Sequence, residues 1–216
     1  MRNATKVTVL TFSALMGLAG IEHGPGEILQ GSTAPAGLLF PSWPASAFFR
    51  SMGGEPAMTL VPNMLATGIL AILFSLAFLA WEGLFVERKN GGLILILLAV
   101  AMLLVGGGIF PPVIGILIGI LATRINAQLI GWCIHFPAAL RAFLGRLWPW
   151  SFGACVLAWL CLFPGINILS YFFGVNNPAF TLTLIVLALG FLGLTVLTGL
   201  ARDSKRRPAL SHPEAS

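Results

Sequence analysis

The sequence predicts an all-α membrane protein, a polytopic transmembrane helical bundle of about six spans with both termini in the cytoplasm. Hydrophobic residues make up 57% of the 216 residues, charged residues make up only 9%, and the mean hydropathy is +0.95. Soluble domains have about 45–50% apolar and ~25% charged residues, so this chain cannot cover its surface with polar groups. Apolar stretches recur along the chain, and short basic clusters lie between them. This excludes a water-soluble enzyme, a disordered chain and a nucleic-acid-binding domain.

The first apolar stretch follows Arg2 and predicts a span over residues 6–24. A basic start, an apolar core and the small residues Gly17-Leu18-Ala19 are also typical of a cleaved signal peptide. We favour a retained span, because the rest of the chain is already an insertion signal and a polar cluster directly follows this segment. Cleavage remains the alternative.

The second predicted span, residues 58–81, contains no charged residue and ends at Trp81, an aromatic typical of a membrane interface. The third, residues 91–110, contains three consecutive glycines near its end and is followed by Pro111-Pro112, which stops a helix. Residues 112–124 are short for a span. They form either a tilted fourth span or, together with residues 91–110, a re-entrant hairpin.

The second half of the chain predicts one interfacial helix and two more spans. Residues 138–147 carry an apolar stripe flanked by arginines, which is typical of a helix lying on a membrane surface. The fifth span is residues 151–170, with a break at Pro164, and the sixth is residues 180–201. Residues 1–201 thus form a single transmembrane domain, and the polar tail 202–216 is expected to be disordered and cytoplasmic.

The basic residues predict the orientation in the plasma membrane. With the N-terminus in the cytoplasm, every lysine and arginine except Arg50 falls on the cytoplasmic side. The reverse orientation would violate the positive-inside rule at nearly every loop.

The outer side holds the unusual polar residues. Glu22, His23 and Glu27 lie at the outer end of the first span, and two helices containing proline bring Asn63 and Asn167 to a similar depth. Broken helices near ionisable residues are how membrane proteins build ligand sites. These five residues are the candidate ligand-binding set, and Glu22, His23 and Glu27 are also a candidate metal site. The alternative is a structural cap, with Gly20 and Gly24 permitting close helix contact.

The sequence leaves the biochemical activity and any cofactor open, because Walker, Rossmann and nucleophile-elbow patterns are absent. The first hypothesis is a transporter-like or binding protein that binds a cation or a small solute at the Glu/His cluster. The second is a membrane-embedded enzyme acting on a lipidic or exported substrate at the outer face. The third is an accessory or scaffold subunit. Expected partners are the lipid bilayer and, through small-residue helix faces, a second copy or another membrane protein; nucleic acid is not expected.

Overall fold

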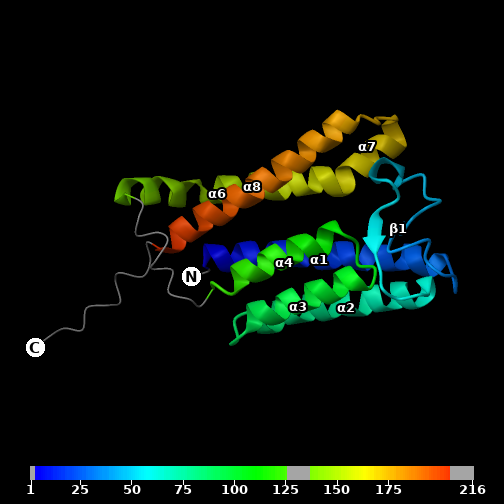
Figure 1. Ribbon diagram of the computed structural model, residues 1–216. Coiled ribbons are helices and arrows are strands. Elements are labelled where there is room, and N and C mark those ends of the chain that lie inside the picture. Colours follow the sequence, from blue (N-terminus) through cyan, green and yellow to red (C-terminus); the bar gives the residue numbers. More distant parts are fainter. Residues whose placement is uncertain (1–2, 126–136, 205–216) are drawn as a thin grey trace, which may run out of the picture. The chain divides into compact units, whose positions relative to one another are not determined.

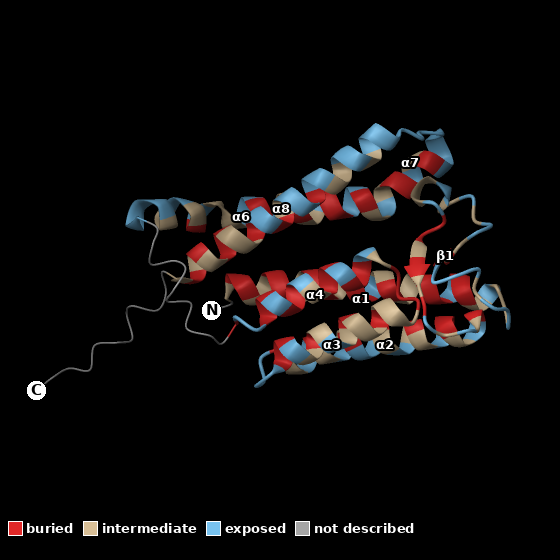
Figure 2. Ribbon diagram, viewed as in Figure 1, coloured by how far each residue is buried: buried red, intermediate tan, exposed pale blue. Residues whose placement is uncertain are grey.

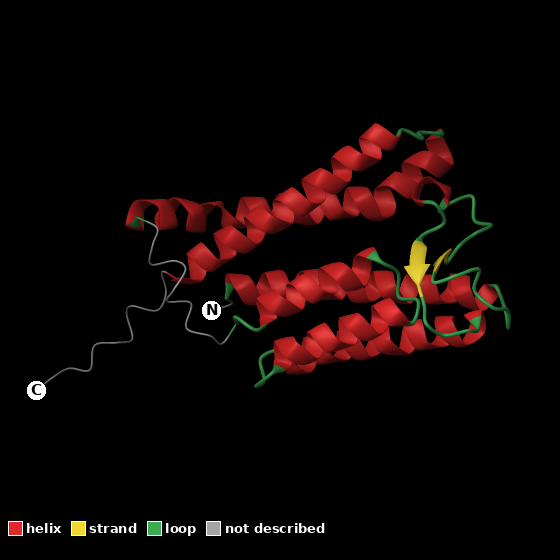
Figure 3. Ribbon diagram, in the orientation of Figure 1, coloured by secondary structure: helices red, strands yellow, loops and turns green. Residues whose placement is uncertain are grey.

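The computed structural model describes residues 3–125 and 137–204, and most of these residues are helical (Figures 1 and 3). This confirms the predicted all-helical class. Among the described residues, four helical segments are long and apolar enough to cross a membrane: Ala4–Leu29, Met64–Phe85, Ala138–Phe173 and Pro178–Ser204. The expectation of disorder for residues 205–216 lies outside the described residues.

The chain divides into two compact units. We name the first the terminal unit, because its described residues, 3–8, 137–165 and 177–204, lie near both ends of the chain. We name the second the central unit; its described residues are 9–125 and 166–176.

In the terminal unit, α6 (Ala138–Leu160) packs along α8 (Pro178–Ser204) (Figure 1). The prediction of a separate interfacial helix over residues 138–147 differs from the structure, because α6 continues through Pro149. Packing explains the continuity. Gly145 lies against the backbone of Arg202, and the Trp148 indole Nε1 donates to Thr8 Oγ1 at 3.3 Å. The first half of α6 is therefore held by α8 and by the start of α1 (Ala4–Leu29).

The end of α8 caps the beginning of α1. Asp203 accepts hydrogen bonds from the Ala4 N–H at 2.9 Å, from the Thr5 N–H at 2.8 Å and from the Thr5 hydroxyl at 2.8 Å. The first N–H groups of a helix have no partner within the helix, so a carboxylate here satisfies them and also interacts favourably with the helix dipole. The helix α8 extends to Ser204, so residues 202–204 are helical and do not belong to the disordered tail that the sequence predicted.

In the central unit, α1 packs closely on α2 (Met64–Phe85) through glycines. A Cβ added at Gly24 would lie 2.8 Å from the carbonyl oxygen of Gly68, and one at Gly68 would lie 2.5 Å from that of Gly24. Gly24 therefore has the packing role that its spacing from Gly20 suggested. Beside them α3 (Gly91–Leu104) packs on α4 (Phe110–Ala122). Figure 2 shows buried positions alternating with exposed ones along all four helices.

A short antiparallel hairpin, β1 (Leu39–Pro41) and β2 (Pro56–Met58), lies between α1 and α2 in the chain. The backbone stays extended after β2 and pairs with the segment that follows α3. Thr59 forms a β-bridge with Val105, and the Gly106 N–H donates to Met58 O at 2.9 Å. These backbone pairs explain why α2 begins at Met64 rather than at the expected residue 58. They also explain why α3 ends at Leu104 rather than at residue 110.

The helices α3 and α4 are short. With 14 and 13 residues, each is about 20 Å long at ~1.5 Å per residue, less than the ~30 Å thickness of a hydrocarbon core. Both geometries expected for this pair, a short span or a re-entrant hairpin, are compatible with these lengths.

The predicted break at Pro164 is present. Residues Cys161–Gly165 (η2) interrupt the helix, and Phe163 has the non-helical angles φ −134° and ψ 113°. The next helix, α7 (Ile166–Phe173), belongs to the central unit. The interruption therefore assigns Asn167 to the same unit as the Glu/His cluster.

Candidate functional site

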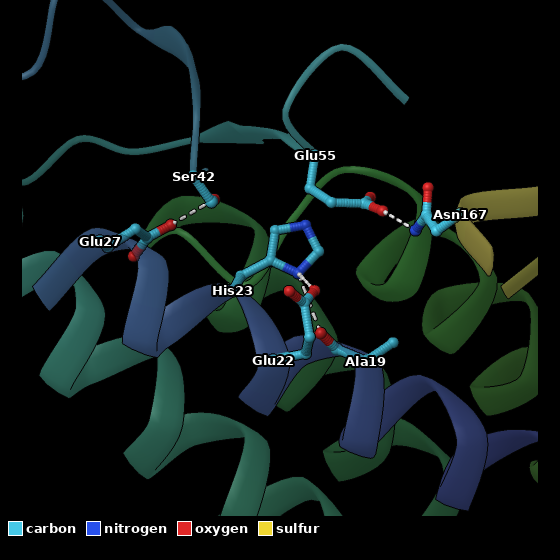
Figure 4. A network of polar contacts seen from close by, with 7 residues as sticks. All are labelled: Ala19, Glu22, His23, Glu27, Ser42, Glu55 and Asn167. Carbon is cyan, nitrogen blue, oxygen red and sulfur yellow. Dashed lines mark hydrogen bonds and ion pairs between the residues drawn. The ribbon is translucent and has the colours of Figure 1, made fainter. Parts of the chain in front are cut away.

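The last turns of α1 position three ionisable side chains (Figure 4). The helix continues beyond Pro25 to Leu29, so Glu22, His23 and Glu27 are helical residues rather than the start of a loop. His23 and Glu27 are four residues apart and share one face. His23 is 3% exposed and Glu27 is 0% exposed, whereas Glu22 is partly exposed.

The histidine ring is held by its own helix. Nδ1 of His23 lies 2.9 Å from the carbonyl oxygen of Ala19, and because a carbonyl can only accept, Nδ1 carries the hydrogen. Nδ1 also lies 3.4 Å from Oε2 of Glu22, an ion pair when the ring is protonated. In the neutral ring Nε2 is left as a hydrogen-bond acceptor.

The glycine turn between α3 and α4 covers the cluster. A Cβ added at Gly108 would lie 2.6 Å from Nε2 of His23, and one added at Gly106 would overlap the carboxyl of Glu27. Both glycines have positive φ, 95° for Gly106 and 83° for Gly108, a conformation that favours glycine. The glycine run seen in the sequence is therefore a turn shaped to lie directly on His23 and Glu27.

The hairpin loop supplies further polar groups. The Ser42 hydroxyl donates to Oε1 of Glu27 at 3.0 Å. Glu55, just before β2, is 4% exposed and receives a hydrogen bond of 3.4 Å from the Asn167 amide, whose oxygen accepts from the Ser51 hydroxyl at 2.7 Å. Burial raises the pKa of Glu55 to about 7, and the hydrogen bond from Asn167 opposes that rise only in part.

The three carboxyl groups form one electrostatic system. Glu22 lies close enough to Glu27 and to Glu55 for like charges to repel. Within the described chain, no lysine or arginine forms an ion pair with any of the three. Oε2 of Glu27 is buried and makes no hydrogen bond to described residues. The Trp43 indole N–H lies beside the Glu22 carboxyl and interacts with it as a donor, in a looser geometry than the hydrogen bonds above. The cluster therefore has more buried acceptors than donors.

The structure brings four of the five predicted residues together, namely Glu22, His23, Glu27 and Asn167 (Figure 4). Asn63 has a different role. Its side chain caps α2 by accepting from the Ala66 N–H at 3.1 Å, and it donates to the Ser32 hydroxyl at 2.7 Å. Sequence reasoning missed Glu55 and Ser42. Glu55 had one signal, an acidic residue in an otherwise apolar loop, and Ser42 had none.

The metal hypothesis for Glu22, His23 and Glu27 gains no support. Over residues 3–125 and 137–204, no three His, Cys, Asp or Glu side chains are grouped to hold a metal ion. Two atoms that would be ligands are already engaged, since Nδ1 of His23 donates to Ala19 and Oε1 of Glu27 accepts from Ser42.

Comparisons of the chain with protein-family models, with curated proteins and with solved structures gave no match.

Proposed function

We propose that the protein is a multi-pass plasma-membrane protein that binds a small cationic solute at the cluster of Glu22, His23, Glu27 and Glu55, as a carrier or as a binding protein. The proposal rests on the burial of the Glu27 carboxyl group. The Glu27 side chain is fully buried, and one carboxyl oxygen has no hydrogen-bond partner among the described residues. A buried carboxylate is costly unless donors or a cation compensate it. A ligand that supplies donors and positive charge would do so.

The orientation belongs to the same proposal, with six crossings, both termini in the cytoplasm and the cluster at the outer side. The contacts of Asp203 with Ala4 and Thr5 support an even number of crossings, because they join the start of α1 to the end of α8. The basic clusters support the cytoplasmic location of both ends. The count of six takes α3 and α4 as two short spans.

The enzyme hypothesis has weaker support. Nucleophilic catalysis needs a hydroxyl or thiol within hydrogen-bond reach of a base. The Ser42 hydroxyl in the cluster donates to Glu27, and Nδ1 of His23 is bonded to a backbone carbonyl. A binding role uses these groups without a nucleophile.

A scaffold role has one specific observation in its favour. In the terminal unit, a Cβ added at Gly153, Gly190 or Gly193 would meet no described atom within 4 Å. Small residues open on a helix face permit close approach of another transmembrane helix, from a second copy or from a partner. Such a contact is compatible with ligand binding in the central unit.

Equilibrium binding to purified protein in lipid nanodiscs tests the proposed function. We expect saturable heat on titration with methylammonium or potassium chloride at pH 8, and loss of at least tenfold in affinity in Glu27→Gln. Glu87→Gln is the matched control, because Glu87 is exposed in the turn after α2. If neither of these cations nor any larger ammonium ion binds in a manner that depends on Glu27, the cluster is a structural cap and the proposal is wrong.

A further inference from the structure

The loop between β1 and β2 carries a chain of aromatic rings. We name Trp43, Phe48 and Phe49 the aromatic strap. Trp43 stacks on Phe49 with ring centroids 5.2 Å apart, and Phe48 meets Phe49 edge to face at 5.0 Å. The chain of rings continues into α7, because Phe48 meets Tyr171 at 5.8 Å. Such pairs stabilise one another beyond their buried area.

The aromatic strap lies directly on α1 beside the carboxyl groups. Gly26 makes this approach possible, since a Cβ there would lie 2.6 Å from the Trp43 indole and 2.5 Å from the Ser42 carbonyl oxygen. The Gln30 amide holds the same segment by donating to Ser42 O at 2.9 Å. Trp43 therefore lies against Gly26, which is next to Glu27 in the chain and one turn after Glu22, and its indole is next to the Glu22 carboxyl.

We propose that the ligand is an organic ammonium ion, whose charged nitrogen binds among Glu22, Glu27 and Glu55 while its apolar part contacts the aromatic strap. This inference rests on the proposed function and narrows its ligand class. An ammonium group supplies the donors that the buried oxygen of Glu27 lacks. An aromatic face attracts such a cation through its negative quadrupole.

The carboxyl groups and the aromatic strap together favour an organic ammonium ion over two other classes of ligand. A hydrated alkali ion would gain little from Trp43 and Phe49, since these rings offer no oxygen ligand. A neutral aromatic solute would contact the aromatic strap but would leave the buried carboxyl oxygens uncompensated. Only a ligand with both a cationic and an apolar part uses both halves of the site.

Entry of such a ligand requires the aromatic strap to move away from α1, because His23, Glu27 and Glu55 are buried in this structure. The packing of Trp43 on Gly26 and the hydrogen bond of Gln30 to Ser42 would open, together with three hydrogen bonds of the polar cluster. These three are the hydrogen bonds of Ser42 with Glu27, of Ser51 with Asn167 and of Asn167 with Glu55. An ammonium ion would replace the donors that Glu27 and Glu55 lose on opening.

The experiment compares benzylammonium chloride with benzyl alcohol, its neutral analogue of similar size, and with potassium chloride, by calorimetric titration of nanodisc samples at pH 8. We expect benzylammonium to bind at least tenfold more tightly than either of the other probes. Trp43→Leu should weaken benzylammonium binding ~3- to 30-fold, the range of a cation–π contact, and Trp43→Phe should restore most of it. The matched control is Trp150→Leu, because Trp150 lies on α6 in the terminal unit and is 79% exposed.

The outcomes separate this inference from the proposed function. If potassium or methylammonium binds in a Glu27-dependent way while benzylammonium binds no better and Trp43→Leu has no effect, the ligand class is wrong and the cation site stands. If benzyl alcohol binds as well as benzylammonium, the site recognises an apolar solute, and the inference is overturned. If no cation binds in a Glu27-dependent way, both proposals are wrong.

Discussion

The terminal unit and the central unit each bury an acidic side chain, Asp203 and Glu27, and the surroundings of the two differ. Asp203 is 5% exposed and accepts three hydrogen bonds from the first turn of α1. Glu27 is 0% exposed and accepts one, from Ser42, while its second oxygen has no partner in the described part of the chain. The protein itself thus supplies hydrogen-bond donors that compensate the burial of the Asp203 carboxylate, and it does not do so for both oxygens of Glu27.

This difference distinguishes a structural carboxylate from a candidate ligand group. A buried charge with a full set of donors stabilises the contact between the two helices that it joins. A buried carboxyl with too few donors lowers stability, and a protein that keeps one retains a place for a proton or a cation. Substitutions that remove either kind of carboxylate therefore should change stability and binding in different ways.

Replacement of Asp203 by alanine should cause the largest loss of stability. It removes three hydrogen bonds and leaves the N–H groups of Ala4 and Thr5 without their acceptor, so we expect the free energy of unfolding to fall by ~4 kcal/mol. Unfolding of the purified protein in mixed micelles measures the change. Asp203→Asn keeps one acceptor oxygen and should lose about half as much. A loss below ~1 kcal/mol in Asp203→Ala would contradict the capping role, and ligand binding should be unchanged.

Glu55 should make stability depend on pH. Its pKa is raised from 4.5 to about 7 by burial, so between these values the folded protein holds a proton that the unfolded chain releases. The contribution of Glu55 to stability therefore falls as pH rises from 4.5 to about 7, by up to ~3 kcal/mol, and this contribution does not change further above that range. Unfolding measured from pH 4 to 9 should show this slope, reduced in Glu55→Gln. Binding of a cation should strengthen over the same range, because the ionised carboxylate is the binding form. Equal slopes in the two proteins would exclude Glu55 as the titrating group.

Local sequence patterns predicted most of the helices and part of the site. Apolar stretches between basic clusters gave the long helices, Pro164 gave the break before α7, and the acidic and imidazole side chains of α1 were recognised as unusual for an apolar segment. The end of a helix at the glycine run before Pro111-Pro112 was expected because proline and glycine end helices in a recognisable way. These features depend on residues close together in the chain.

The missed features depend on pairing between distant residues. The strand that delays α2 to Met64 forms because Met58 and Thr59 pair with residues 105 and 106, and no periodicity in residues 58–63 indicates a partner that far away. Asp203 reaches the first turn of α1 from the other end of the chain in the same way. Asn63 was assigned to the site from its depth, but both of its polar atoms are used elsewhere: Oδ1 caps α2, and Nδ2 donates to the Ser32 hydroxyl.

The glycine turn should tolerate no side chain. In Gly108→Ala the positive φ costs ~1 kcal/mol and the new Cβ presses on the His23 ring, for a total of ~2 kcal/mol. Gly31→Ala is the matched control, because Gly31 also has a positive φ, 75°, with nothing within 4 Å of an added Cβ. The difference between the two variants measures the contacts with His23 and, at 3.0 Å, with Pro111 Cδ. Equal losses in thermal unfolding would mean that the turn does not press on the ring.

The smallest expected effect on stability is also the most diagnostic, because its sign is opposite to that of Asp203→Asn. Glu27→Gln removes a charge that the protein does not compensate and keeps an oxygen that can accept from Ser42. We expect the free energy of unfolding to stay the same or to rise by up to ~1 kcal/mol, while cation binding is lost. Parallel unfolding and calorimetric titration of the same preparation measure both quantities. A loss of stability as large as that of Asp203→Asn would make Glu27 a structural carboxylate like Asp203, and the distinction between the two units would disappear.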